Sequence, residues 1–204
     1  MKYTSKILQN AVDVFSSLPG IGRKSALRIV LHLAQSEQNK TINFSEALSI
    51  LADKLKTCKI CFSYSDEEIC EICNNPARDS SVICVVESIR DLMAIEETHH
   101  FKGVYHVLNG LISPVDGIGP DKLNIYPLVE KIKKQTIKEL IMAIRPSIEG
   151  DTTVYYITKQ INSDAVKISM IARGISFGSD LEYADEFTLA RSIAERKPYQ
   201  YQSN

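Results

Sequence analysis

The residues best suited to chemistry are four cysteines that lie close together in the chain. They form two C-x-x-C pairs, Cys58 with Cys61 and Cys70 with Cys73. Two thiolates three positions apart can bind one metal ion from a single turn, and two such turns complete a tetrahedral site. Four sulfur ligands favour zinc, with iron as the alternative, and they leave no open position for a substrate. We therefore expect a structural zinc site, and a disulfide pair or a thiol redox motif is the competing interpretation.

A second set of candidate residues is acidic and follows predicted strands. Glu87 comes directly after one apolar run, with Asp91 one helical turn later, and Glu149 and Asp151 form an acid-x-acid pair after another run. In parallel sheets functional residues gather at the carboxyl ends of the strands, and such acids can hold a divalent metal for phosphoryl transfer. The arrangement resembles the Toprim domain of primases, topoisomerases and related nucleases. Surface acids at loop starts are the alternative interpretation.

The third candidate site is a short turn between two predicted helices. It contains Gly20 and Gly22, followed by Arg23, Lys24 and, about one helical turn on, Arg28. Backbone N–H groups at such a turn can face a phosphate, and the helix dipole favours its negative charge. The three cations would add attraction to a nucleic-acid backbone. The segment resembles the helix-hairpin-helix motif, which binds DNA without reading its sequence; a plain turn between helices is the alternative.

Apolar periodicity predicts the elements that position these residues. Before the cysteines, we expect helices over residues 7–18, 25–33 and 45–57. The third helix is expected to contribute core residues, namely Phe44, Leu48, Leu51, Ala52 and Leu55. After the cysteines, we expect strands over residues 82–86, 104–108, 140–144 and 166–172, and helices over residues 89–97, 128–138, 152–161 and 186–196. Alternating strands and helices indicate an α/β unit with a mostly parallel sheet.

Composition and charge limit the compartment and the partners. The chain has 204 residues, of which 44% are hydrophobic and 24% charged, and its net charge is −1. No apolar run approaches the roughly 20 residues that span a bilayer, and the N-terminus does not resemble a signal peptide. We therefore expect a cytoplasmic protein whose thiols stay reduced. Residues 1–57 carry a net charge of +4 and the remainder −5, so a polyanion would bind at the N-terminal end.

In order along the chain, these segments resemble the RecR family of bacterial recombination mediators. Besides the turn and the cysteines, the resemblance rests on residues 85–87, 105–108, 110–120, 172–174 and 180–186. The fold class that it implies is α/β overall. The implied domains are a helix-hairpin-helix DNA-binding region (residues 1–57), a C4-type zinc finger (58–73), a Toprim domain (80–175) and a C-terminal segment for oligomerisation (176–204).

The resemblance also implies a function, that of a DNA-binding protein of recombinational repair with no catalytic activity. Such a protein forms a ring-like oligomer, expected to be a tetramer, and acts with RecO and RecF at the nucleoid to load recombinase on gapped or single-stranded DNA. Lys24 and Arg28 are then the expected DNA contacts, and the Toprim acids face RecO. Two alternatives stay open. One is a metal-dependent Toprim nuclease or primase-like enzyme that uses Glu87, Glu149 and Asp151, and the other is a scaffold with little DNA affinity.

The sequence departs from the family pattern at four positions. Asn109 stands where glycine is frequent, Asp151 where glutamate is usual, and Ser176 where proline is common. Arg145 stands where asparagine or aspartate is usual. This arginine would place a positive charge beside the acids that could hold magnesium, so the sequence leaves magnesium binding open. None of the departures affects the glycine turn or the cysteines.

Overall fold

The computed structural model describes residues 5–161, 166–172, 174–175 and 178–198. The chain divides into two compact units, Met1–Leu55 and Lys56–Asn204. Among the described helices, none is long and apolar enough to cross a membrane. The departure noted at Ser176 lies outside the described residues.

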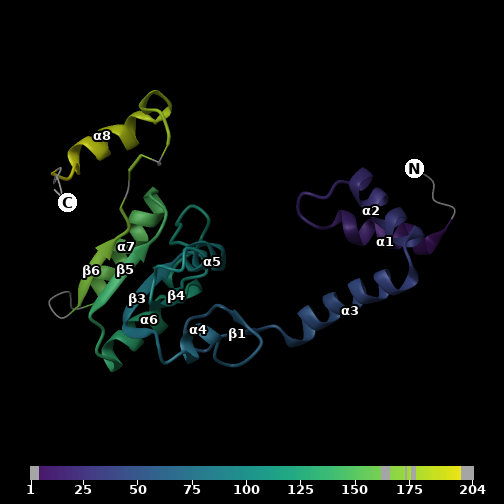
Figure 1. Cartoon of the computed structure of the whole chain (residues 1–204), viewed down its shortest axis with the longest axis horizontal. Helices are drawn as coiled ribbons and strands as arrows, with labels where there is room; N and C mark the ends of the chain where they lie inside the picture. Colours follow the sequence, from purple (N-terminus) through teal and green to yellow (C-terminus); the bar gives the residue numbers. More distant parts are fainter. Residues whose placement is uncertain (1–4, 162–165, 173, 176–177, 199–204) are drawn as a thin grey trace, which may run out of the picture. The chain divides into compact units, whose positions relative to one another are not determined.

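The N-terminal unit is a helix pair followed by a longer helix (Figure 1). Its helices are α1 (Lys6–Ser16), α2 (Arg23–Gln35) and α3 (Gln38–Lys54). Val12 of α1 packs against Ala26 and Val30 of α2, and these three buried side chains form the core of the unit. The first two helices are confirmed by the structure, whereas the third begins earlier than the sequence predicted. The short connection between α1 and α2 carries the glycine turn.

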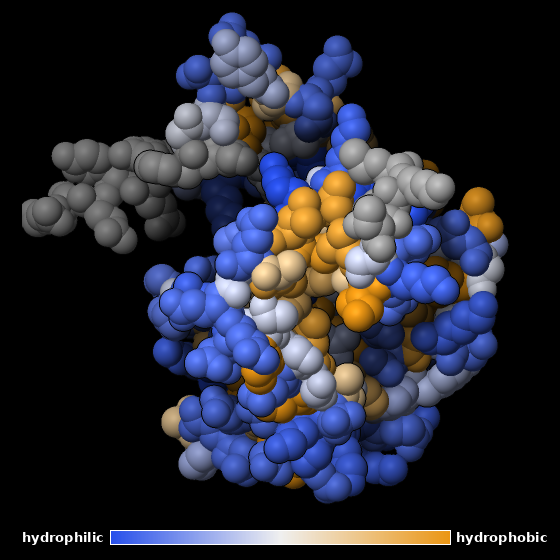
Figure 2. All heavy atoms as spheres, turned by 90° about the vertical axis from the view of Figure 1, so that its right-hand side faces the viewer, coloured by the Kyte–Doolittle hydropathy of each residue, from blue (hydrophilic) through white to orange (hydrophobic). Residues whose placement is uncertain are grey.

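The prediction that the third helix contributes core residues is wrong. No residue of α3 is buried in the described unit, and Phe44 and Leu48 are 42% and 49% exposed. The other residues predicted to be buried there are exposed as well, namely Leu51, Ala52 and Leu55. The physical reason is that the unit is small. Its two short helices α1 and α2 bury their apolar side chains against each other, and the described part of the unit contains no further element that could cover α3. Figure 2 shows the resulting hydrophobic patch on this unit.

The second unit begins with the cysteine segment and continues into a sheet. In the cysteine segment, the antiparallel strands β1 (Lys56–Thr57) and β2 (Tyr64–Ser65) are followed by the short helix α4 (Glu71–Asn74). We call residues 58–73 the knuckle. The four-stranded sheet is entirely parallel, and its spatial order is β4-β3-β5-β6. Its strands are β3 (Asp79–Val86), β4 (Gly103–Val107), β5 (Glu139–Ala143) and β6 (Lys167–Met170).

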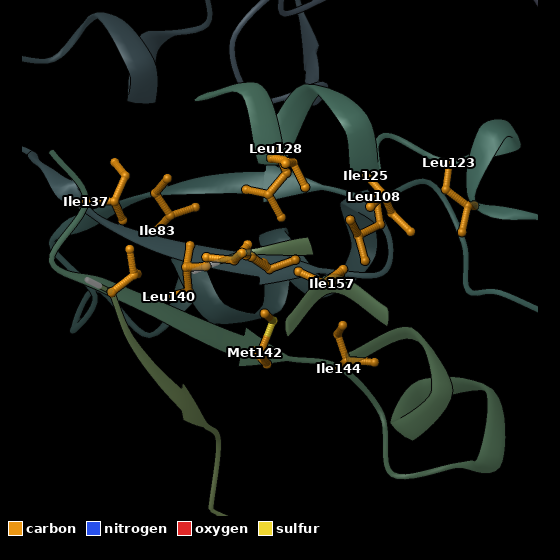
Figure 3. Packing of buried hydrophobic residues seen from close by; sticks show 14 of the residues in the cluster. Ile83, Leu108, Leu123, Ile125, Leu128, Ile137, Leu140, Met142, Ile144 and Ile157 are labelled. Atoms are coloured by element: carbon orange, nitrogen blue, oxygen red, sulfur yellow. The ribbon is translucent and has the colours of Figure 1, made fainter. Parts of the chain in front are cut away.

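Helices connect the parallel strands and cover both faces of the sheet. They are α5 (Ile89–Glu97), α6 (Ile125–Lys134) and α7 (Ile148–Gln160). On one face, the fully buried Ile83 and Leu140 of the strands pack with Leu128 of α6 and Ile157 of α7 (Figure 3). Burying each such side chain contributes about 1.5–3 kcal/mol. The predicted α/β fold with a parallel sheet is confirmed.

The opposite face of the sheet is covered by α5. Leu92 of this helix packs with Val86, Tyr105 and Cys84 of the strands. Cys84 is thus a small core side chain, and it does not belong to the knuckle. After the sheet, the described chain continues through a 3₁₀ turn (Leu181–Tyr183) into α8 (Glu186–Ala194), whose N-terminus is capped by Asp185. The predicted C-terminal helical segment is therefore present.

Candidate metal centre and nucleic-acid interface

The knuckle brings the sulfur atoms of Cys58, Cys61, Cys70 and Cys73 within 4.8 Å of one another. The Sγ atoms of Cys61 and Cys70 are 3.5 Å apart. Four ligands at a Zn–S distance of about 2.3 Å would lie about 3.8 Å from each other in a tetrahedron. All five cysteines of the chain are free thiols, and the thiols of Cys58 and Cys61 are fully buried. The donor set therefore fits a structural zinc ion.

Backbone geometry holds the thiols in place. The first C-x-x-C pair closes a turn in which Phe62 has a φ of 64°, and the N–H of this residue donates to the carbonyl of Cys58. The N–H of Cys70 donates to Cys58 Sγ (3.3 Å), and the N–H of Cys73 donates to Cys70 Sγ (3.5 Å). N–H groups that point at sulfur stabilise the thiolate form, which is the form that binds metal.

The four thiols share their protons unequally. A hydrogen bond from Cys73 lowers the pKa of Cys61 to about 5, and the same contact raises the pKa of Cys73. Burial raises the pKa of Cys70 to about 11. Without a metal, one thiolate is thus stabilised at the expense of its neighbours. A zinc ion removes this conflict because it binds all four sulfurs as thiolates.

The knuckle is attached to the sheet by backbone and side-chain contacts. The N–H of Val107 in β4 donates to the carbonyl of Cys61 (2.8 Å). Next to it, the ring of Phe62 contacts the ring of His106 edge-on, with centroids 5.3 Å apart. His106 is fully buried, and burial lowers its pKa to about 4, so the imidazole is neutral. Its Nε2–H donates to the carbonyl of Asn124, directly before α6 (2.6 Å).

Lys131 of α6 also faces the knuckle. Its side chain is half-buried, and burial lowers its pKa, while the nearby thiol groups of Cys73, Cys61 and Cys58 act in the opposite direction. Within the part of the chain that the structure describes, its ammonium group makes no ion pair. A zinc ion with four thiolates carries a net charge of −2, which this ammonium would partly balance. Sequence periodicity placed Lys131 on a basic helix but gave no sign of this role.

The Toprim acids lie near one edge of the sheet but do not form one ligand group. Glu87 Oε2 is 3.1 Å from Arg145 Nε, and burial raises the pKa of Glu87. Asp91 accepts hydrogen bonds from the N–H and the hydroxyl of Ser88 (2.8 and 2.7 Å), which caps α5. Over the described ranges, the cysteines are the only group of three or more side chains placed to bind a metal. The acids as arranged do not fit a magnesium ion.

The other two acids lie in the first turn of α7, which begins before the predicted start of this helix. They are Glu149 and Asp151, and hydrogen bonds at the helix N-terminus lower the pKa of Glu149. The loop over residues 108–120, which is rich in glycine and proline, packs on this helix, because the N–H of Ile112 donates to Thr153 Oγ1 (2.9 Å). Within the loop, Ser113 and Ile118 form an isolated β-bridge. The loop is therefore shaped by its contact with α7 and by its own β-bridge.

The glycine turn opens α2 and displays part of the predicted cation set. Gly20 has a φ of 77°, which favours glycine, and Gly22 lies directly before the helix, where no side chain caps its N–H groups. Arg23 Nη2 contacts Asp13 Oδ1 of α1 (2.9 Å), so this arginine connects the two helices. Lys24 and Arg28 are exposed and lie four positions apart on one helix face. The geometry suits contacts with successive phosphates of a backbone.

Comparisons with known proteins agree with this order of segments. Four family models match the chain. They are the RecR helix-hairpin-helix over residues 8–51, the RecR four-cysteine zinc finger domain over 55–75, the Toprim domain over 81–172 and the RecR C-terminal region over 174–197. The matches cover the glycine turn, the knuckle and the sheet.

Curated relatives match over nearly the full length of the chain. Recombination protein RecR of Phocaeicola vulgatus is 52% identical over 195 residues, which cover 96% of this chain and 95% of that protein. The protein of the same name from Flavobacterium johnsoniae is 51% identical over 200 residues, covering 98% of this chain and 97% of the relative. Recombination protein RecR of Amoebophilus asiaticus is 51% identical over 199 residues, which cover 98% of this chain and 100% of that protein.

Proposed function

Because the chain belongs to the RecR family, we propose that it is a DNA-binding mediator of recombinational repair. The observation that carries the proposal is the hairpin, in which exposed Lys24 and Arg28 flank an uncapped helix N-terminus. These groups contact phosphate and sugar rather than base edges, so binding does not depend on sequence. The space that a Cβ would occupy at Gly20 and Gly22 is empty, so the backbone at the turn is open to an approaching phosphate.

The sequence suggested that Arg23 attracts the nucleic-acid backbone together with Lys24 and Arg28. In this proposal its first role is instead to connect the two helices of the hairpin. Its contact with Asp13 links α2 to α1, which pack through Val12, Ala26 and Val30. Both side chains are about half exposed, so the pair contributes little stability by itself. Arg23 then adds positive charge near the phosphate, while Lys24 and Arg28 make the direct contacts.

The knuckle has a structural role in this mediator. Its four cysteines hold zinc, and the bound ion cross-links two turns of the chain that contain little hydrophobic core of their own. The contacts of Cys61 and Phe62 with β4 then attach the cross-linked knuckle to the sheet. The knuckle thus gives the chain between hairpin and sheet a defined structure.

The finer parts of the proposal concern assembly and partners. We assign the protein to a ring-like oligomer, expected to be a tetramer, that acts with RecO and RecF at the nucleoid in the cytoplasm and helps to load recombinase on gapped or single-stranded DNA. Exposed apolar residues on α3 and around α8 support an assembly, because a second copy would cover them. The acidic edge with Glu87, Asp91, Glu149 and Asp151 faces RecO and performs no chemistry. Support for this comes from Glu87 and Asp91, which are engaged by Arg145 and Ser88.

The double substitution Lys24→Ala/Arg28→Ala tests the DNA contacts. We expect weaker binding to every DNA sequence and a smaller dependence of log K on log salt, by about 0.7–0.9 for each phosphate that the protein no longer neutralises. Fluorescence anisotropy with labelled single-stranded and duplex DNA at several salt concentrations measures both.

The matched control for this test is Lys40→Ala/Lys54→Ala, which removes the same charge from α3 of the same unit. It should keep the salt dependence of the unsubstituted protein more closely than the hairpin variant does. If both variants lost DNA affinity and salt dependence equally, net charge alone would explain the effect, and the proposed hairpin contacts would be contradicted.

A further inference from the structure

A fixed positive charge lies at the edge of the sheet where the Toprim acids begin. β3 and β5 are parallel neighbours, with Val86 opposite Ala143, so the chain leaves both strands at the same edge (Figure 1). Glu87 follows β3 directly, and Arg145 follows β5 by two residues. The ion pair between them therefore joins the ends of the two central strands.

The backbone of both members of this pair is held in place, although the side chain of Arg145 is 62% exposed. The carbonyl of Glu87 accepts a hydrogen bond from the N–H of Gly110, and its side chain is only 23% exposed. On the other strand, a Cβ at Gly150 would lie 2.2 Å from the carbonyl oxygen of Arg145. The first turn of α7 thus packs directly on the backbone of Arg145, which fixes the point from which the guanidinium reaches Glu87.

The partly buried carboxylate of Glu87 requires a positive charge, because burial without one penalises its charged form. Asp91, one helical turn later, is itself acidic, and its Oδ2 accepts hydrogen bonds from the N–H and the hydroxyl of Ser88. The described acids also do not converge into a group of three oxygen donors. The charge that balances Glu87 therefore comes from the chain itself.

We propose that Arg145 occupies the place of a divalent cation at Glu87, so that this edge of the sheet is ordered and functions without a metal ion. The guanidinium is permanently charged and presents its donors in a rigid plane, so it balances the carboxylate over the whole physiological pH range. An incoming Mg²⁺ or Mn²⁺ would have to displace it and would meet its repulsion. The proposal concerns this chain's acidic edge alone and does not depend on the DNA-binding hairpin.

Direct Mn²⁺ binding tests the proposal, measured by electron paramagnetic resonance on the full-length, zinc-loaded protein. We expect no Mn²⁺ binding to the unsubstituted protein that depends on Glu87. Arg145→Ala should gain Glu87-dependent Mn²⁺ binding, with an overall Mn²⁺ affinity at least about tenfold above that of the unsubstituted protein, because a repelling charge has been removed beside a carboxylate left without a partner. The double variant Arg145→Ala/Glu87→Gln should lose this gain.

Two controls separate charge at this position from charge in general. Arg145→Lys keeps the positive charge and should not gain Mn²⁺ binding. Arg90→Ala removes an exposed arginine from α5, three residues after Glu87, and should behave as the unsubstituted protein does.

Thermal unfolding gives a second readout, in which Mn²⁺ should raise the Tm of Arg145→Ala and leave that of Arg145→Lys unchanged. The proposal is overturned if the unsubstituted protein binds Mn²⁺ and Glu87→Gln abolishes that binding. It is equally overturned if Arg145→Ala binds Mn²⁺ no better than the unsubstituted protein, which would reduce the ion pair to a surface contact.

Discussion

At the scale of single residues, His106 connects three parts of the second unit. Its ring contacts Phe62 of the knuckle, its Nε2–H donates to the chain before α6, and its backbone lies in β4. The buried Nδ1 has no hydrogen-bond partner among the described residues, so a proton on it would leave a charged and unsatisfied N–H group in the interior. Protonation of this one side chain therefore opposes folding.

The pH dependence of stability should reveal this effect. The pKa of His106 is about 4 in the folded protein and near 6.5 when unfolded, so its contribution is complete above about pH 6.5 and is lost as the pH falls toward 4. We expect His106→Gln, whose amide can still donate to Asn124, to show a shallower loss of unfolding free energy between pH 7 and about pH 5. Urea unfolding of both proteins with excess zinc measures the difference.

Because the two proteins share the pH dependence of zinc binding, only the difference between their curves reports on His106. Parallel curves would show that the histidine is not the titrating group.

At the scale of elements, the knuckle depends on the sheet and helix beside it as well as on its own cysteines. It contains two short strands and one turn of helix, which are too little to fold alone. Contacts with β4 and the nearby ammonium group of Lys131 in α6 therefore help the cysteines to stabilise the knuckle and its metal site. Zinc affinity should therefore respond to a change in α6, outside the C-x-x-C motif.

Lys131→Met tests this dependence, since methionine fills a similar volume without the charge. We expect the variant to lose zinc to a competing chelator about five- to tenfold more readily, because a positive charge near a centre of charge −2 is removed. Chelator competition with a coloured zinc indicator measures the ratio.

Lys133→Met is the matched control, because Lys133 lies on the same helix but is exposed and pairs with Glu130. Equal zinc retention in the two variants would disprove the electrostatic role of Lys131.

At the scale of the whole molecule, the exposed apolar residues of α3 indicate that another protein surface covers this helix. Phe44 and Leu48 line a groove with Leu8, Phe15 and other residues of the same unit, and the ring of Phe44 stacks on that of Phe15. The patch is visible in Figure 2. A chain that assembles with copies of itself, as we propose for this one, would remove such a face from water.

Native mass spectrometry should accordingly find an assembly of several copies of the chain, and the expected number of copies is four. Phe44→Glu/Leu48→Glu should shift the population toward smaller assemblies, because two charges would have to be buried. Gln38→Glu/Asn43→Glu adds the same charge to polar positions of α3 and should leave the mass unchanged. A monomer at every protein concentration, or the same shift in both variants, would contradict the assembly.

The sequence by itself determined the features that depend on local spacing. Two C-x-x-C pairs specify a metal site because the ligands lie on adjacent turns, and the alternation of apolar runs with helical patterns specified the parallel sheet. Gly20 and Gly22 marked the turn, and the spacing of Lys24 and Arg28 by one helical turn placed them on one side of the following helix. Residues whose role is set within a few positions of the chain could thus be identified.

Only the tertiary structure decided the features that depend on contacts between distant segments. The burial of His106 against Phe62 and the approach of Lys131 to the knuckle join residues that are far apart in the sequence. The sequence indicated that Arg145 would lie beside the acids, but its pairing with Glu87 was visible only in the structure. The exposure of α3 belongs here as well, since periodicity shows which face of a helix is apolar but not whether anything covers it. Whether a residue is buried depends on which other segments pack against it, and the spacing of apolar residues within one helix does not specify those segments.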